Sequence, residues 1–190
     1  MTMILLYSLL FFFIGAIPFS YLLGKLFNLD ITRFGDKNPG AYNAFSAGGI
    51  KLGLPSLLMD FLKGAVPVFL YKNQITEMDF TIIPVSIAPV LGHAFSPFLR
   101  FKGGKAIAVS FGIWAGLTTY QAPMIIGSIH LFQKYMLKVL KNCWRIIIAI
   151  SSYSLFALFM GHSIILFLIG IIDTSIIAIK HWDEIRNRTL

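Results

Sequence analysis

The chain has 190 residues, of which 57% are hydrophobic and 13% charged, and its net charge is +8. A water-soluble globule of this size needs more polar side chains than that to cover its surface. The composition also excludes an ordinary nucleic-acid binder, because such a protein presents its basic charge on a soluble polar face. We expect one integral membrane domain over residues 1–190, with no nucleic-acid partner.

Uncharged or nearly uncharged stretches long enough to cross a bilayer occur along most of the chain. A membrane-spanning helix needs about 20 mostly apolar residues. Such stretches cover residues 1–24, 52–71, 80–99, 106–133 and 146–172. Residues 1–24 have neither a basic leader nor a small-residue cleavage site, so we interpret them as a retained span rather than a signal peptide.

Lysine and arginine gather in four clusters, and these orient the chain. The clusters lie at residues 25–51, 100–105, 134–145 and 180–188. Basic residues favour the cytoplasmic side of a membrane. If all four clusters are cytoplasmic, the N-terminus lies outside and the C-terminus lies in the cytoplasm.

This parity requires the two longest apolar stretches to contain two helices each, with turns near residues 118–123 and 161–163. The sequence therefore predicts an all-α, multi-pass membrane protein: a bundle of about seven transmembrane helices, some of them short. Five or six helices are the alternative, because the stretch from 106 to 133 is barely long enough for two.

The largest non-apolar interval, residues 26–50, is rich in turn-forming residues. Within residues 35–43, Pro39 fixes one backbone torsion and Gly40 permits a positive one, so successive N–H groups can face one concavity. An interval of this length inside a compact protein is uncommon unless it has a function. A plain surface turn between two spans is the alternative.

A second polar segment, residues 101–105 with the sequence FKGGK, directly precedes an apolar stretch. Gly103 and Gly104 leave backbone amides accessible, the following helix presents its positive end, and Lys102 and Lys105 add full charges. These features predict a cradle for an oxyanion or a phosphate. A basic membrane anchor with a flexible joint is the alternative, although an anchor does not need adjacent glycines.

Three other titratable side chains stand out. Asp60 and Lys63 are three residues apart in an apolar stretch and so share a helix face. We interpret them as a structural pair, with a contribution to a polar pocket as the alternative. His181 falls just after the last span, in the same cytoplasmic layer as the two polar segments, and histidine suits proton transfer near neutral pH. We expect no metal, because no His, Cys and carboxylate cluster has ligand spacing.

These segments resemble the bacterial acyl-phosphate-dependent glycerol-3-phosphate acyltransferases, which are small polytopic membrane enzymes. The resemblance covers nearly the whole chain in order and spacing. It rests on residues 15–25, Asn38–Ala41 with Asn43, Asp60–Gly64, Leu91–His93, residues 101–105, and His181 with Ile185.

Membership of that family implies transfer of a fatty acyl group from acyl-phosphate to the 1-hydroxyl of glycerol 3-phosphate. The product is lysophosphatidic acid, an intermediate of phospholipid biosynthesis at the cell inner membrane. The resemblance implies a seven-helix bundle with a cytoplasm-facing site, and glycerol 3-phosphate, acyl-phosphate and membrane lipid as partners. We expect no cofactor, because acyl-phosphate is already activated and the site has only to hold, align and stabilise charge.

The site residues follow from the segments that carry the resemblance. Those expected to bind phosphate or position substrate are Asn38, Gly40, Asn43, Lys102, Gly103, Gly104 and Lys105. His181 is the candidate for proton handling. Asp36, at the family's serine position, is a second candidate base.

Three positions near these segments depart from the family pattern. Asp36 replaces a serine, Ser46 replaces an arginine, and Glu184 replaces an asparagine. Losing the arginine removes a bidentate phosphate donor, and the two carboxylates add negative charge near a phosphate site. A second hypothesis is therefore a non-catalytic relative that binds lipid or phosphate in the membrane.

Overall fold

The computed structural model describes residues 2–75, 77–136, 141–161 and 164–186, and within them it contains helices and no strands. The helices are α1 (Thr2–Ala16), α2 (Phe19–Leu26), α3 (Ala41–Lys72), α4 (Ile82–Ala94), α5 (Ile107–Thr118), α6 (Gln121–Met136), α7 (Asn142–Phe159), α8 (Ile164–Lys180) and α9 (Trp182–Arg186). Short 3-10 turns occupy Ile31–Arg33 and Pro97–Leu99. The all-α prediction is confirmed, and α1 with α3 to α8 supply the longer helices of the expected bundle.

Four segments in the described part of the chain are long and apolar enough to cross a membrane. They are Thr2–Leu26, Ala41–Lys72, Ile82–Leu99 and Asn142–Phe159, with α5 as a shorter apolar helix. Large apolar side chains cover the outer faces; Leu5 is 70% exposed and Phe159 is 80% exposed. An outer surface of this kind fits a lipid surrounding and not water.

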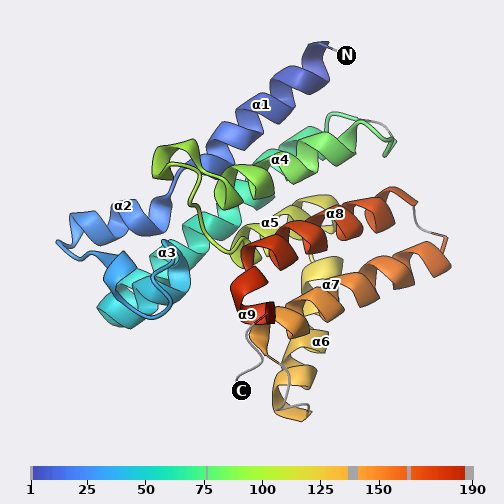
Figure 1. Cartoon of the computed structure of the whole chain (residues 1–190). Helices are drawn as coiled ribbons and strands as arrows, with labels where there is room; N and C mark the ends of the chain where they lie inside the picture. The colour runs from blue at the N-terminus through green and yellow to red at the C-terminus, as the bar shows by residue number, and fades with distance from the viewer. Residues whose placement is uncertain (1, 76, 137–140, 162–163, 187–190) are drawn as a thin grey trace.

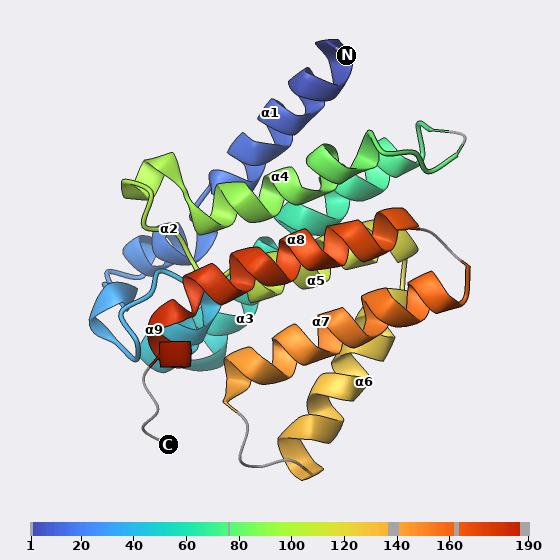
Figure 2. The same ribbon diagram turned by 45° about the vertical axis from the view of Figure 1, so that its right-hand side comes forward.

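The long helices lie side by side and run between two ends of the bundle (Figures 1 and 2). One end holds α2, the start of α3 and α9, and we call it the site end. The end of α3, the start of α4, the end of α7 and the start of α8 lie at the opposite end. Helices α3 and α4 therefore run in opposite directions, and so do α7 and α8, while α6 lies at an angle to them.

Glycines let the most extensively packed helix pairs, α3 with α5 and α1 with α4, approach closely. A Cβ on Gly112 of α5 would lie 2.1 Å from the carbonyl oxygen of Phe61. A Cβ on Gly92 of α4 would lie 2.0 Å from the carbonyl oxygen of Phe12. Small residues at such contacts are how membrane helices gain packing contacts without a hydrophobic driving force.

The turn expected within residues 118–123 is confirmed, because α5 ends and α6 begins there. The second expected turn falls between α7 and α8, but its His162 and Ser163 lie outside the described residues. Lys138 and Arg188, which belong to two of the basic clusters, also lie outside them.

Two boundaries differ from the sequence-based expectation. The stretch 1–24 is divided into α1 and α2, because Pro18 has no N–H with which to continue the helix. The interval 26–50 is helical from Ala41 onward, with a kink at Gly49, where φ is 61° and ψ is −153°. Glycine tolerates this left-handed torsion, so polar turn formers here bend a helix and do not prevent one.

The break between α1 and α2 leaves backbone carbonyls without helical partners, and side chains from other helices satisfy them. The Ala16 oxygen accepts a hydrogen bond from Ser96 Oγ at 2.6 Å. The Ile17 oxygen accepts one from Lys63 Nζ at 2.9 Å. Unsatisfied backbone groups are expensive in a bilayer, so these two bonds fix the place where the chain can bend.

Lys63 is itself held by a buried carboxylate. Its Nζ lies 2.8 Å from Asp60 Oδ1, and both side chains are only 2% exposed. Asp60 Oδ2 accepts a hydrogen bond from Ser20 Oγ at 2.7 Å, and His93 Nδ1 lies 3.7 Å from Oδ1. The pair expected from the spacing is formed, and it joins α2, α3 and α4.

Replacing Lys63 with Met should lower the free energy of unfolding by about 3–5 kcal/mol, because Asp60 is then left as an unpaired buried charge. The double variant Asp60→Asn/Lys63→Met should recover part of that loss. Lys51→Met, at an exposed position of the same helix, serves as the control. Denaturant unfolding in detergent micelles measures these differences, and a Lys63→Met protein as stable as wild type would contradict this role.

Candidate functional site

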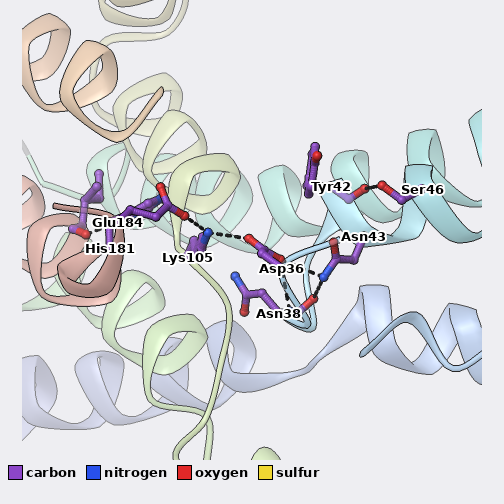
Figure 3. Close-up of polar contacts among 9 residues, drawn as sticks. Asp36, Asn38, Tyr42, Asn43, Ser46, Lys105, His181 and Glu184 are labelled. Atoms are coloured by element: carbon purple, nitrogen blue, oxygen red, sulfur yellow. Dashed lines mark hydrogen bonds and ion pairs between the residues drawn. The ribbon is translucent and has the colours of Figure 1, made fainter. Parts of the chain in front are cut away.

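Three segments far apart in the sequence meet at the site end around the ammonium group of Lys105 (Figure 3). Lys105 Nζ forms ion pairs with Asp36, in the loop before α3, and with Glu184, in α9. Lys105 itself belongs to the loop that leads into α5. The predicted convergence of the two polar segments with the C-terminal region is therefore present in the structure.

Asp36 also organises its own loop. Its Oδ1 accepts hydrogen bonds from the backbone N of Asn38 at 3.1 Å and from Asn43 Nδ2 at 2.8 Å. Asn43 Nδ2 also donates a hydrogen bond to the Asn38 carbonyl oxygen at 2.7 Å, and the Asn43 side chain is buried. A Cβ on Gly35, whose φ is 50°, would lie 2.2 Å from Asn43 Oδ1. The buried Asn43 side chain thus holds the loop together through its hydrogen bonds to Asp36 and Asn38.

Asn38 connects this loop to the one before α5. In the amide orientation that satisfies its neighbours, its side-chain oxygen accepts from the backbone N of Lys105 at 3.2 Å, and its nitrogen faces the Gly103 carbonyl at 3.3 Å. Gly40 precedes α3 as its N-cap residue, and a Cβ there would meet nothing within 4 Å. The backbone at Gly40 is therefore the more open part of this turn.

The two glycines before Lys105 pack against α4, which differs from the sequence-based expectation of accessible amides. Gly103 and Gly104 are buried, and the Gly104 N donates to the His93 carbonyl at 3.0 Å. A Cβ on Gly103 would lie 2.0 Å from that carbonyl oxygen, and one on Gly104 would lie 2.1 Å from His93 Nε2. Because the loop lies this close to α4, only glycine fits, and the cationic groups of the segment come from its lysines. Lys102 is exposed.

His181 lies between α8 and α9, one turn before Glu184 (Figure 3). Its side chain is buried, and Nδ1 lies 2.9 Å from the Ile177 carbonyl oxygen. A carbonyl can only accept, so Nδ1 carries the proton and Nε2 is left as the acceptor. Burial lowers the pKa of His181 below its ordinary value, so the ring is mostly neutral at pH 7.

Electrostatics keep the cluster ionised. Burial acts to raise the pKa of Asp36, but hydrogen bonds and charge from Lys105 outweigh it and hold that pKa below its ordinary value. Burial acts to lower the pKa of Lys105, but the hydrogen bonds that it donates to Asp36 and Glu184 outweigh burial and hold that pKa above its ordinary value. Asp36 is therefore a carboxylate at neutral pH, and its lowered pKa makes it a weaker base than an ordinary aspartate.

The third basic cluster reaches the same end of the bundle. Lys141, just before α7, donates from Nζ to the backbone carbonyl of Glu184 at 2.9 Å. Lys105 and Lys141 thus approach α9 from two different basic clusters. This contact supports two helices between residues 106 and 136, since a single helix would have placed Lys141 at the opposite end.

Several features of the site and its surroundings were not predicted from the sequence. Glu184 was noted only as a departure from a family pattern, and the structure places it on Lys105. Asp173, for which the sequence offered no role, accepts hydrogen bonds from Ser110 Oγ at 2.7 Å and Trp114 Nε1 at 3.0 Å, which joins α8 to α5. The short spacing from His93 to the FKGGK segment was the one signal of the packing between them.

Ser46, at the family's arginine position, hydrogen-bonds within its own helix, from Oγ to the Tyr42 carbonyl at 3.1 Å. Within the described residues no hydrogen bond or ion pair joins Ser46 to the Lys105 cluster, and Figure 3 shows it farther along α3, beyond Tyr42. The described residues also contain no group of three His, Cys, Asp or Glu side chains that could hold a metal ion.

The fold and the site together define a polytopic all-helical membrane protein with a lysine paired to two carboxylates at one end. Residues 5–189 match the family model for glycerol-3-phosphate acyltransferase. The chain belongs to this glycerol-3-phosphate acyltransferase family.

Relatives that bear this name are similar over different shares of their length. The chain is 33% identical to the Trichlorobacter lovleyi protein over 180 residues, which cover 92% of this chain and 88% of the relative. It is 42% identical to the Pseudothermotoga lettingae protein over 137 residues, which cover 70% of this chain and 67% of the relative. It is 40% identical to glycerol-3-phosphate acyltransferase 1 of Thermotoga maritima over 117 residues, but spans only 58% of that relative's length.

Two solved structures share the fold. Both are crystal structures of PlsY (YgiH), an integral membrane glycerol 3-phosphate acyltransferase, one in a glycerol 3-phosphate form and one in a lysophosphatidic acid form. Each superposes with a TM-score of 0.85 at 26% identity over 96% of this chain and covers 90% or 89% of the solved chain. The predicted class of integral membrane protein is confirmed.

Replacing Gly104 with Ala should lower the free energy of unfolding by about 1–3 kcal/mol, because the added Cβ forces the loop away from His93. Gly127→Ala is the matched control, since a Cβ there would meet only Phe111 at 3.9 Å and alanine favours a helix. Thermal unfolding in detergent compares the two variants. Equal stability of both would contradict the close packing of the loop on α4.

Proposed function

We propose that this chain transfers a fatty acyl group from acyl-phosphate to the 1-hydroxyl of glycerol 3-phosphate, giving lysophosphatidic acid and inorganic phosphate. The observation that carries the proposal is the meeting of the loop before α3, the loop before α5 and helix α9 at Lys105. This convergence occurs in a member of the family, on a fold shared with the glycerol 3-phosphate form of PlsY.

In the proposed reaction the acceptor hydroxyl oxygen attacks the acyl carbonyl carbon and forms an ester bond. The bond between that carbon and the phosphate oxygen breaks, and inorganic phosphate leaves with the electron pair. The ammonium groups of Lys105 and exposed Lys102 bind the phosphate oxygens and stabilise the charge that grows on them. Holding both substrates beside one another supplies much of the remaining acceleration.

His181 is the proposed acceptor for the proton of the attacking hydroxyl. Its ring is mostly neutral at pH 7, and its Nε2 has a lone pair because Nδ1 faces the Ile177 carbonyl. Asp36 remains a second candidate base, but its lowered pKa favours a role in holding Lys105. Asn38, Gly40 and Asn43 would position the loop and its open backbone beside the substrate.

The site end is proposed to face the cytoplasm in a multi-pass protein of the cell inner membrane, with the N-terminus outside. Lysines from separate basic clusters meet there, as the contacts of Lys105 and Lys141 with Glu184 illustrate. Basic residues favour the cytoplasmic side. The acyl chain would lie between helices, where the bilayer supplies an apolar surrounding.

A second candidate function is non-catalytic binding of phosphate or lipid. The observation that favours it is the occupation of Lys105 by two of the chain's own carboxylates. The two functions differ in turnover, which the next experiment measures.

Purified protein in detergent, given acyl-phosphate and glycerol 3-phosphate, should release phosphate and form lysophosphatidic acid. Lys105→Ala should lower turnover by about a hundredfold or more, because it removes a cation aimed at the leaving phosphate. Lys51→Ala, an exposed lysine in α3, should retain wild-type turnover. Phosphate detection with mass spectrometry of the lipid product checks both results. If the wild type releases no phosphate above background while a PlsY control is active, the acyltransferase function is contradicted and non-catalytic binding is the function that stands.

Fusions after Leu190 test the proposed orientation. Green fluorescent protein at this position should fluoresce, because it folds in the cytoplasm, and alkaline phosphatase should be inactive there. Alkaline phosphatase activity with a dark fluorescent fusion would place the C-terminus outside and contradict the parity of the four basic clusters.

A further inference from the structure

The ammonium group of Lys105 is already occupied by two carboxylates of the same chain. It pairs with Asp36 and Glu184, whose side chains are 33% and 38% exposed, while that of Lys105 is 25% exposed. With one cation and two anions, the cluster carries a net charge of −1. A phosphate group that approaches Lys105 therefore meets two negative groups already bound to it.

Carboxylate and phosphate oxygens are the same kind of acceptor for an ammonium group. We propose that Asp36 and Glu184 compete internally with the phosphate of the substrate for Lys105, and so set the affinity of this protein for that phosphate. This inference rests on the proposed function, because it concerns the same anion site. It makes the two carboxylates positioning residues, which act on the substrate through Lys105.

The structure distinguishes the two competitors. Asp36 is tied into its loop, because its Oδ1 also accepts from Asn38 N and Asn43 Nδ2. Within the described residues, the carboxylate of Glu184 makes its hydrogen bond to Lys105, while its backbone carbonyl is held by Lys141. Glu184 can therefore swing away without breaking another bond of its carboxylate, and it is the group that yields to phosphate.

Removing each carboxylate charge tests the competition directly. The variants are Glu184→Gln and Asp36→Asn, which keep the shape of each side chain, and Asp183→Asn as the matched control. Asp183 is an exposed neighbour of Glu184 in α9, so its variant removes the same charge from the same helix. Calorimetry measures the Kd for glycerol 3-phosphate without an acyl donor, and steady-state kinetics measure KM and kcat.

Glu184→Gln should lower the Kd for glycerol 3-phosphate by about threefold to fivefold, which corresponds to the loss of one partly exposed ion pair. Its KM should fall in parallel while kcat changes little. Asp36→Asn should give a smaller gain, because the same change loosens the loop. Asp183→Asn should bind as the wild type does.

An unchanged or higher Kd in Glu184→Gln would overturn the proposal, and Glu184→Asn provides a second charge-removing variant with the same expected direction. Binding of inorganic phosphate and of a non-hydrolysable acyl phosphonate shows whether the competing phosphate belongs to the acceptor or to the donor. If Glu184→Gln binds glycerol 3-phosphate more tightly but the wild-type protein shows no turnover, the competition is supported and the acyltransferase function is rejected. A lack of binding by all variants would reject the anion site itself.

Discussion

The need to satisfy backbone carbonyls inside a bilayer governs this structure. Where Pro18 ends the first helix, Lys63 donates to the Ile17 carbonyl, and Asp60 neutralises the charge that Lys63 brings into the protein. The same carboxylate lies near His93, on whose ring and carbonyl the loop before α5 is packed. The buried ion pair of α3 thus lies beside the histidine against which the site loop packs.

On that framework the site is assembled by charge. Lys105 joins the loop before α3 to α9, and mutual interaction holds Asp36 and Lys105 in their ionised forms. His181 stays neutral nearby because it is buried. In the proposed reaction Lys105 would supply the cation and His181 the proton acceptor for acyl transfer from an already activated donor.

Patterns that depend on composition could be predicted from the sequence. Long uncharged stretches and the distribution of lysine and arginine predicted the helices, the turn after α5 and the convergence of the polar segments at one end. Features that depend on tertiary contact could not. Nothing in the sequence indicated that Glu184 reaches Lys105, which lies 79 positions away, or that Gly104 is buried against His93. The helical start of α3 was missed because turn formers, Asn43, Ser46, Gly48 and Gly49, interrupt the apolar residues there.

The central claim is that the oxygen of the acceptor's 1-hydroxyl becomes the ester oxygen of the product at this site. Glycerol 3-phosphate labelled with ¹⁸O at the 1-hydroxyl, incubated with acyl-phosphate and the purified protein, tests it most directly. Mass spectrometry should find the label in the ester linkage of lysophosphatidic acid and unlabelled inorganic phosphate beside it. Free fatty acid as the only acyl product, with the labelled glycerol 3-phosphate unchanged, would contradict the account.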